Sequence, residues 1–212
     1  MEATRLIAVR HGETAWNVDT RIQGQLDIAL NDTGLWQARR VARALEEEPI
    51  AAIYASDLSR AWQTALEIAG PRGMRVTAEP GLRERAFGLF EGRTYADIDA
   101  SLPDQARLWR TRNPEFAPEG GESLLTFRER VTGVAARLAS RHPGELVLLV
   151  AHGGVMDVLY RAATGQELQA PRTWELGNAA INRLLWTPQG FTLVGWADTA
   201  HLGDGTLDEA TA

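Results

Sequence analysis

The sequence contains no cysteine, and this absence excludes several kinds of site at once. Without thiols the chain has no disulfide, no zinc ribbon and no thiol nucleophile. The composition fits a reducing compartment, and we predict a cytoplasmic location. The apolar run near the N-terminus covers only residues 6–9, which is too short for a signal peptide or a membrane-spanning helix. We therefore predict a protein with no membrane partner.

Positive charge is also scarce. The 22 Lys and Arg residues are outnumbered by 28 Asp and Glu residues, which leaves a formal net charge of −6. A nucleic-acid groove needs an excess of basic side chains, so we predict no nucleic-acid partner. The remaining composition, with 44% hydrophobic and 24% charged residues, is that of a globular protein. We expect one domain over residues 1–212, and its aromatic side chains leave a homodimer possible, although no two-fold surface is identifiable.

Apolar patterns along the chain predict strands that alternate with helices. The strands are expected at residues 5–9, 51–55, 75–78, 146–150, 181–186 and 191–196. The main helices are expected after Asn31 and Ser56 as N-caps, over residues 122–141, and directly after His152. This alternation predicts an α/β fold with helices on both faces of a mostly parallel sheet, and the last two strands form a hairpin that adds an antiparallel edge.

One long segment does not follow this alternation. Residues 79–119 contain glycine and proline punctuation and only two short helical stretches, near 95–102 and 104–112. Long irregular segments inside a compact domain usually act as lids or binding regions. We predict a lid or substrate-specificity segment around residues 80–121.

Two of the predicted strands end in a histidine, His11 and His152. Ligands of open α/β sheets bind beyond the carboxyl ends of the strands, so both imidazoles are expected at one site. Arg10 precedes the first histidine, and Arg60 lies on the first turn of the helix that follows the second strand. Helix N-termini and guanidinium groups favour anions. These residues predict a phosphate site that has no carboxylate cluster for a metal.

A histidine beside a bound phosphate indicates two-step transfer through a covalent intermediate. We expect His11 to attack phosphorus as a neutral imidazole, because the neighbouring arginines disfavour its protonated form. The leaving alkoxide then needs a proton, and Glu84 at the start of the irregular segment is the candidate general acid. Such an acid typically contributes about 10²–10⁴-fold to the rate.

Four ordered segments resemble one known family. They are residues 6–17 (LIAVRHGETAWN), 56–65 (SDLSRAWQTA), 82–92 (LRERAFGLFEG) and 150–154 (VAHGG). Together they resemble the histidine phosphatase superfamily, which is also called the phosphoglycerate mutase-like family. A lone Arg-His-Gly triplet is a weak signal, whereas four segments in order, each at its expected strand end or loop, are a strong one.

The resemblance implies a fold and a set of roles. The fold would be a three-layer α/β/α sandwich, and no metal or organic cofactor is implied. The implied phosphorylated residue is the histidine at position 11, with Arg10, Arg60 and His152 completing the phosphate pocket and Glu84 as proton donor. The further residues expected to contact phosphate are Asn17, Gln23, Gly24 and Gly153.

The length of the chain favours one branch of this family. Cofactor-dependent phosphoglycerate mutases usually carry a longer insertion and a longer tail, and this chain resembles the shorter members, most of which are phosphatases. We predict a metal-independent phosphatase that acts on a small phosphorylated metabolite. The alternatives are a phosphoglycerate mutase and a non-enzymatic module that binds a phosphorylated ligand. A zinc hydrolase is disfavoured, because no His-Glu-x-x-His spacing is present.

Each candidate residue also has a purely structural explanation. The two histidines could be hydrogen-bonded core residues, Arg10 and Arg60 could form buried salt bridges, and Glu84 could belong to a solvated ion pair. Arg107, Arg110 and Arg112 could clamp a carboxylate or a second phosphate of the substrate, or simply form a solvated helix face. The sequence leaves these alternatives open.

Overall fold

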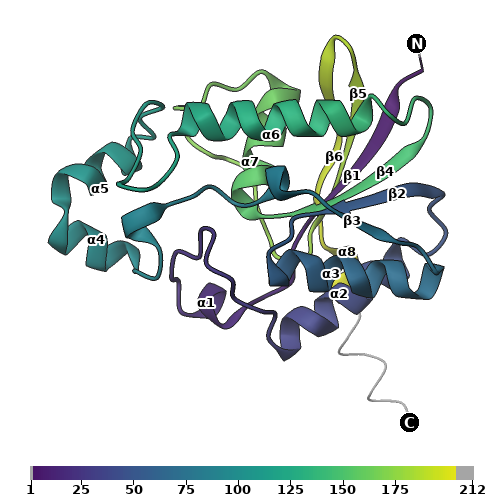
Figure 1. Cartoon of the computed structure of the whole chain (residues 1–212), viewed down its shortest axis with the longest axis horizontal. Helices are drawn as coiled ribbons and strands as arrows, with labels where there is room; N and C mark the ends of the chain where they lie inside the picture. Colours follow the sequence, from purple (N-terminus) through teal and green to yellow (C-terminus); the bar gives the residue numbers. More distant parts are fainter. Residues whose placement is uncertain (1, 204–212) are drawn as a thin grey trace.

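The computed structural model describes residues 2–203, and its centre is a six-stranded β-sheet (Figure 1). The strands are β1 (Thr4–Arg10), β2 (Ile50–Ala55), β3 (Val76–Ala78), β4 (Leu146–Ala151), β5 (Ile181–Thr187) and β6 (Gly190–Asp198). Their order across the sheet is β3-β2-β4-β1-β5-β6. The first four strands are parallel, β5 is antiparallel to β1, and β6 is antiparallel to β5. The predicted mostly parallel sheet with an antiparallel edge is confirmed.

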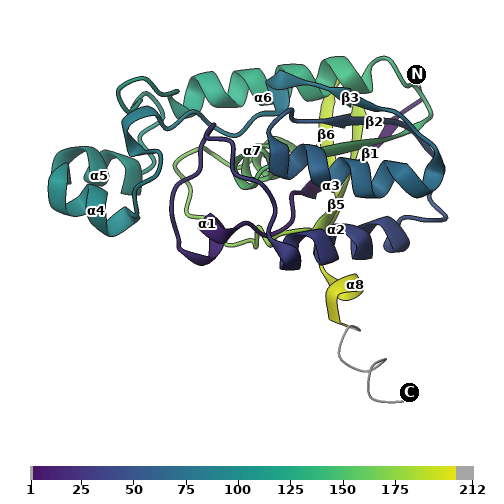
Figure 2. The same ribbon diagram turned by 60° about the horizontal axis from the view of Figure 1, so that its bottom comes forward.

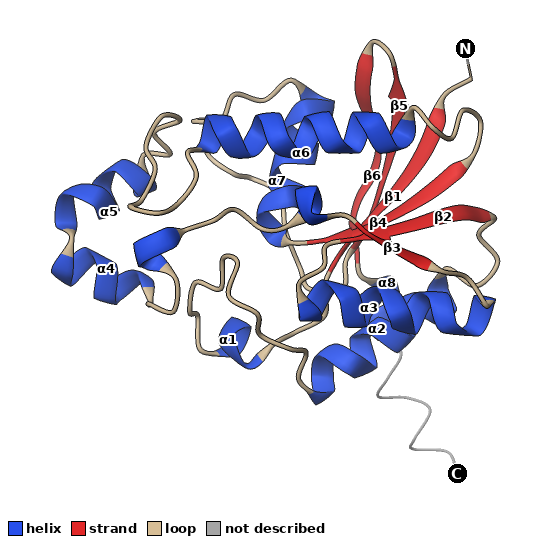
Figure 3. Ribbon diagram, viewed as in Figure 1, coloured by secondary structure: helices blue, strands red, loops and turns tan. Residues whose placement is uncertain are grey.

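Helices lie on both faces of the sheet and also beyond its end (Figure 3). They are α1 (Ala15–Val18), α2 (Asp32–Ala44), α3 (Ser59–Ala69), α4 (Tyr95–Ser101), α5 (Pro103–Arg110), α6 (Leu124–Ala139), α7 (Gly153–Thr164) and α8 (Ala200–Gly203). Helices α2 and α3 cover one face, and α6 and α7 cover the other. This arrangement confirms the three-layer α/β/α sandwich. Within residues 2–203, no helix has the length and apolar character required to cross a bilayer.

Alternation along the central strands divides the core in two. Leu6 and Ala8 of β1 pack toward α6 and α7, whereas Ile7 and Val9 pack toward α2 and α3. Strand β4 lies between β2 and β1 and is buried along its whole length. Because both of its faces are covered, both sets of alternating side chains must be apolar, which explains the unbroken run of residues 146–150.

One predicted helix cap is correct and one is wrong. The Asn31 side chain accepts a hydrogen bond from the Gly34 amide at the start of α2, as expected for an N-cap. Ser56 does not cap α3, because that helix begins at Ser59 and its N-cap residue is Leu58, which makes no side-chain cap. The Ser56 hydroxyl instead contacts His152, a partner that lies 96 positions away along the chain.

Most of residues 80–121 form a lobe beyond the end of the sheet, whereas Leu82 at the start of this segment packs in the main core. Figure 2 shows α4 and α5 standing away from the strands. A small third cluster of buried side chains, built around Phe90, Ile98 and Ala106, holds this lobe together. The two expected short helices correspond to α4 and α5. The role of this segment as a lid stays a prediction. The small, polar and acidic sequence after His201 predicts a loosely held tail; its first two residues lie in α8, and residues 204–212 lie outside the described structure.

Candidate active site

Strand register brings the two strand-end histidines together. In the parallel pair β1 and β4, Val9 lies opposite Val150 and Arg10 lies opposite Ala151. The next residues, His11 and His152, therefore leave the sheet at the same level. Their ring centroids are 5.2 Å apart with an interplanar angle of 60°. The sheet thus places both imidazoles in one site beyond its carboxyl edge.

The loop after β1 holds His11 in one orientation. Its Nδ1 atom lies 2.6 Å from the carbonyl oxygen of Gly12. A carbonyl can only accept, so Nδ1 carries the proton of the neutral ring and Nε2 keeps a free lone pair. A Cβ atom on Gly12 would lie 2.4 Å from the Gly34 carbonyl oxygen. The close packing of this loop on α2 therefore requires glycine.

The environment keeps the His11 ring uncharged. Only 3% of the residue is exposed. Burial holds the pKa of His11 well below its ordinary value, and the charges of Arg10 and Arg60 lower it further. The Asn178 side-chain amide donates to the backbone carbonyl oxygen of His11 at 3.0 Å and helps to hold this residue in place. Sequence reasoning did not identify Asn178, and no motif marks it.

The two arginines are held by backbone carbonyl groups. Arg60 is 1% exposed and donates to the carbonyls of Leu26 at 2.8 Å and Gly24 at 2.7 Å. Arg10 donates to the carbonyl of Leu176. The Nε atoms of both arginines are buried and have no partner in the described part of the chain. Burial lowers the pKa of Arg10 to about 10, which leaves its side chain cationic at neutral pH, and burial also lowers the pKa of Arg60.

The salt-bridge alternative for these arginines does not match the structure. The nearby carboxylate of Asp57 pairs with Arg83 at 2.6 Å. Glu13 accepts a hydrogen bond from Asn31 at 2.9 Å. Among residues 2–203, neither arginine of the site forms an ion pair with a carboxylate. Their positive charge is therefore available to a ligand.

His152 lies deeper than His11 and is fully buried. Its Nε2 atom lies 2.8 Å from the Ser56 hydroxyl oxygen, and its Nδ1 atom has no partner within the described residues. Burial holds the pKa of His152 well below its ordinary value, with smaller contributions from Arg60 and His11. His152 is also the N-cap residue of α7. A second neutral imidazole therefore lies next to the His11 ring, further from solvent.

Glu84 enters the site from the segment that follows β3. Its Oε2 atom accepts a hydrogen bond from the Gly154 amide at 2.9 Å, and its Oε1 atom accepts one from the Arg85 amide at 2.8 Å. A Cβ atom on Gly154 would lie 2.2 Å from Glu84 Oε1, so the carboxylate approaches the start of α7 closely only because residue 154 is glycine. The solvated ion pair considered for Glu84 is absent from the described structure.

Two adjoining cavities surround these groups. The inner pocket has a volume of about 180 Å³ and is lined by Arg10, His11, Asn17, Arg21, Ile22, Gln23, Gly24, Arg60, Glu84 and Phe87. It contains seven of the sequence-predicted site residues. His152 lies beside it through its contact with the His11 ring, and Gly153 lines the neighbouring cavity instead.

Thr14 orients two side-chain amides that line the inner pocket. Its hydroxyl contacts Asn17 Oδ1 at 3.1 Å and Gln23 Oε1 at 3.0 Å. Because the oxygen end of each amide is engaged, the NH₂ end remains as a donor for a ligand. Gly24 adopts φ +52°, a left-handed conformation that favours glycine, and presents its carbonyl to Arg60.

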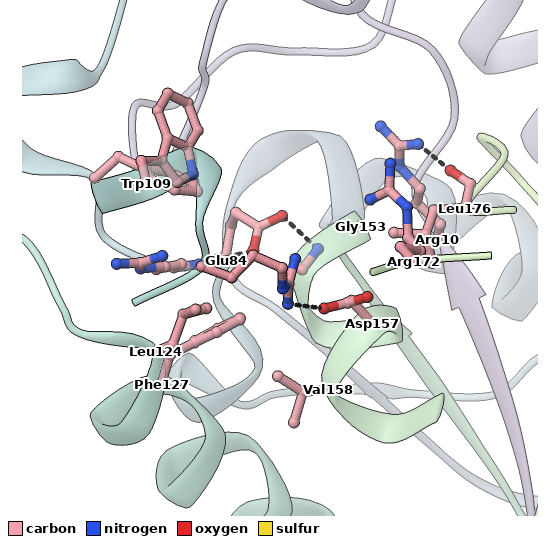
Figure 4. Close-up of a pocket in the computed structure, with 14 residues that line it drawn as sticks. Arg10, Glu84, Trp109, Leu124, Phe127, Gly153, Asp157, Val158, Arg172 and Leu176 are labelled. Carbon is pink, nitrogen blue, oxygen red and sulfur yellow. Dashed lines mark hydrogen bonds and ion pairs between the residues drawn. The ribbon is translucent and has the colours of Figure 1, made fainter. Parts of the chain in front are cut away.

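The outer cavity, drawn in Figure 4, has a volume of about 450 Å³ and adjoins the inner pocket. It is lined by Arg10, Glu84, Arg85, Phe87, Trp109, Arg112, Leu124, Phe127, Gly153, Gly154, Asp157, Val158, Arg172 and Leu176. The two cavities share Arg10, Glu84 and Phe87. Sequence reasoning missed Arg85, Asp157 and Arg172, which belong to three separate segments.

The three arginines at positions 107, 110 and 112 have different surroundings in the structure. Arg107 is exposed and lies 3.7 Å from Asp104, and Arg110 pairs with Asp99 at 2.8 Å. Neither of them lines a cavity of the site. Arg112 does line the outer cavity, where it pairs with Asp157 at 2.7 Å. Only one of the three therefore faces the space a substrate could occupy.

Metal-binding side chains do not cluster among residues 2–203. No group of three or more histidine, aspartate or glutamate side chains in that range is arranged to hold a metal ion. The positive charge that the described residues provide at the inner pocket comes from guanidinium groups.

Comparison with known proteins agrees with this geometry. The family model described as the histidine phosphatase superfamily (branch 1) matches residues 6–199. A metal-independent phosphoserine phosphatase of Arabidopsis thaliana is 37% identical over 208 residues, which cover 95% of this chain and 84% of that protein. The glucosyl-3-phosphoglycerate phosphatase of Mycobacterium tuberculosis (strain ATCC 25618 / H37Rv) is 35% identical over 208 residues, which cover 92% and 93% of the two chains.

The solved structures give the same result. The structure of Bacillus stearothermophilus YhfR has a TM-score of 0.86 and 31% identity, and the match covers 94% of this chain and 99% of that one. Sheet order, site geometry and sequence similarity all lead to one assignment. The resemblance seen in the four motifs is confirmed, and the chain belongs to the histidine phosphatase superfamily (branch 1).

Proposed function

We propose that this chain is a metal-independent phosphatase that hydrolyses a small phosphorylated metabolite through a phosphohistidine at His11. One observation carries the proposal. A buried, uncharged imidazole with Nε2 free lines a small pocket together with two arginines that have no carboxylate partner in residues 2–203. This combination provides a nucleophile and a receptor for a phosphate dianion in the same space.

The chain is a phosphoric monoester hydrolase of its superfamily. Two relatives that match along most of their length are named as phosphatases, one of phosphoserine and one of glucosyl-3-phosphoglycerate. These names support a small phosphorylated metabolite as the substrate. The same two names give less support to the alternative that the chain is a phosphoglycerate mutase.

In the first step, His11 Nε2 forms a bond to phosphorus as the ester P–O bond breaks. The proton stays on Nδ1 and remains hydrogen-bonded to the Gly12 carbonyl oxygen. This hydrogen bond stabilises the positive charge that develops on the ring. The leaving alkoxide takes a proton from the carboxylic acid form of Glu84, and the alcohol departs into the outer cavity that Glu84 also lines.

In the second step, water attacks the phosphohistidine. The Glu84 carboxylate takes a proton from the water as the new O–P bond forms and the P–N bond breaks. The products are inorganic phosphate and the regenerated neutral imidazole. In both steps Arg10, Arg60 and His152 stabilise the charge on the transferring phosphoryl group.

The remaining predicted residues have supporting roles in this proposal. Asn17 and Gln23 donate from their amide NH₂ groups to phosphate oxygens, because Thr14 occupies their oxygen ends. Gly24 anchors Arg60 through its carbonyl. Gly153 begins α7 beside Arg10 and offers its backbone amide at the helix N-terminus. Residues 80–121 form the substrate-specificity lid.

Rapid quench with phosphate-labelled substrate tests the proposal. We expect an acid-labile adduct on wild-type protein, no adduct on His11→Ala, and normal labelling of His142→Ala, whose ring lies elsewhere and contacts Tyr54. Activity should persist in the presence of chelators. Wild-type turnover without an adduct, together with an active His11→Ala protein, would exclude the mechanism.

A second assay separates hydrolysis from phosphoryl transfer. With 3-phosphoglycerate and a trace of the bisphosphate, a mutase would form 2-phosphoglycerate, whereas the proposed phosphatase releases only inorganic phosphate. Turnover of an aryl phosphate would exclude the non-enzymatic module. A cytoplasmic location, where phosphorylated metabolites are formed, is part of the proposal, and a homodimer stays a prediction.

A further inference from the structure

The outer cavity has more positive than negative side chains. Of its lining residues, four are arginines and two are carboxylates. Both carboxylates are already engaged. Asp157 accepts from Arg112 at 2.7 Å and from Arg161 at 3.0 Å. Glu84 accepts two backbone amide hydrogen bonds. The cavity therefore carries positive charge that these two carboxylates do not neutralise.

One of the four arginines differs from the others. Arg10, Arg85 and Arg112 each donate to at least one backbone carbonyl, and these contacts fix their side chains. Arg172 is exposed, and its guanidinium forms no hydrogen bond or ion pair within residues 2–203. A cation that lines a cavity without a protein partner is available to bind a ligand anion.

Arg172 lies close to the phosphate site. Figure 4 shows it beside Arg10, which lines both cavities. After burial, the charge of Arg172 is among the causes that lower the pKa of Arg10. Two guanidinium groups that repel each other at the mouth of a pocket gain free energy when an anion binds between or beside them. In the proposed function the inner pocket binds the phosphoryl group. Arg172, in the outer cavity, is then close to the alcohol part of the substrate.

We propose that Arg172 binds a carboxylate of the substrate, and that the preferred substrates are phosphomonoesters with a carboxylate a few atoms from phosphorus. The inference rests on the proposed phosphatase function. A single unpartnered guanidinium matches the single charge and the planar fork of a carboxylate, whereas a second phosphate dianion would call for a further free cation.

Two pairs of substrates isolate the carboxylate. Phosphoserine and phosphoethanolamine differ only by that group, and in glycerol 3-phosphate a hydroxymethyl group replaces the carboxylate of 3-phosphoglycerate. We expect wild-type protein to prefer the carboxylated member of at least one pair by tenfold or more in kcat/KM. In Arg172→Ala this preference should fall about 10–100-fold, because one charge-assisted interaction is lost. The carboxylate-free esters should change by less than about threefold.

Two further variants serve as controls. Arg172→Lys keeps the charge and should retain part of the preference, while Arg107→Ala removes an exposed arginine outside both cavities and should retain all of it. Equal losses on both members of each pair in Arg172→Ala would overturn the inference, since Arg172 would then serve the phosphoryl group. It would also be overturned if wild type showed no preference in either pair, or if it hydrolysed only p-nitrophenyl phosphate.

The outcomes of these assays stay separate from the test of the phosphatase itself. Adduct formation on His11 and turnover of p-nitrophenyl phosphate do not depend on a carboxylate. If the enzyme is active but shows no preference for carboxylates, only the role of Arg172 is excluded. If the protein forms no adduct and turns over no ester, the proposed function is excluded as well.

Discussion

The inner pocket and the outer cavity are built in different ways. The inner pocket depends on the sheet, since His11 and His152 follow two paired strands and are 3% and 0% exposed. The outer cavity depends on segments laid over that frame, and it includes Trp109 of the α4–α5 lobe and the exposed Arg172. In the proposed mechanism, the phosphoryl chemistry therefore depends on groups held by the core, and the choice of substrate depends on more exposed segments.

Burial explains this division. An imidazole that must stay uncharged needs low solvent exposure. Both the imidazole and the guanidinium groups need fixed partners to keep a set orientation. The inner pocket has these through the Gly12, Gly24 and Leu26 carbonyls. Groups that bind varied substrate bodies need accessible surface, which the outer cavity provides. Four variants test the comparison.

The largest effect of the four is expected at Glu84, which lines both cavities. Glu84→Gln cannot transfer a proton, so kcat/KM for alkyl phosphates should fall about 10²–10⁴-fold. p-Nitrophenyl phosphate has a leaving group that needs no proton and should lose far less. Parallel steady-state assays of both substrate types measure the difference. Equal losses would show that Glu84 is not the general acid.

A somewhat smaller effect is expected at Arg60, which belongs to the inner pocket alone. Arg60→Lys keeps the charge but loses the planar fork, and kcat/KM should fall about 10²–10³-fold for every ester, including the aryl phosphate. Arg39→Lys, at an exposed arginine paired with Glu67, should have no effect. A loss confined to one class of ester would contradict the division between the cavities.

A still smaller effect is expected at Trp109, which belongs to the outer cavity alone. Trp109→Leu should raise KM for alkyl esters about fivefold and leave kcat nearly unchanged, because it removes apolar contact with the substrate body and no contact with phosphate. Trp36→Leu, at a half-exposed tryptophan of α2, is the control. A fall in kcat without a change in KM would argue that Trp109 acts on the chemical step.

The last prediction concerns stability instead of rate. The pKa values of His11 and His152 are lowered in the folded protein below the ordinary value of 6.5. Below about pH 6.5 the unfolded chain therefore binds more protons than the folded one, and the free energy of unfolding falls as the pH falls; above that pH the two histidines contribute no slope. Urea unfolding between pH 5 and 8 should show a shallower acid decline in the His11→Gln, His152→Gln double variant. Parallel curves for the two proteins would contradict the shifted pKa values.

Much of the fold was predictable because its signals are local. The apolar run 146–150 indicated a strand covered on both faces, and the Pro-Gln-Gly turn at 188–190 indicated the hairpin of β5 and β6. The Ser56 cap failed because a side chain that can satisfy a helix end can equally be taken by a distant partner. Sequence alone does not rank those two outcomes.

The residues at the strand ends, and their position at one edge of the sheet, could be predicted from the sequence. Arg10-His11 and His152-Gly153 follow apolar runs, and parallel strands deliver their carboxyl ends to one edge of a sheet, so their meeting follows from the pattern. The contacts that hold these groups, and the residues that surround them, become apparent only in the folded chain. Asn178 reaches the His11 carbonyl across 167 positions, and Arg172 lines the outer cavity from a loop with no motif. Such contacts depend on how the whole chain packs, because no local periodicity records which distant side chain will fill a given space.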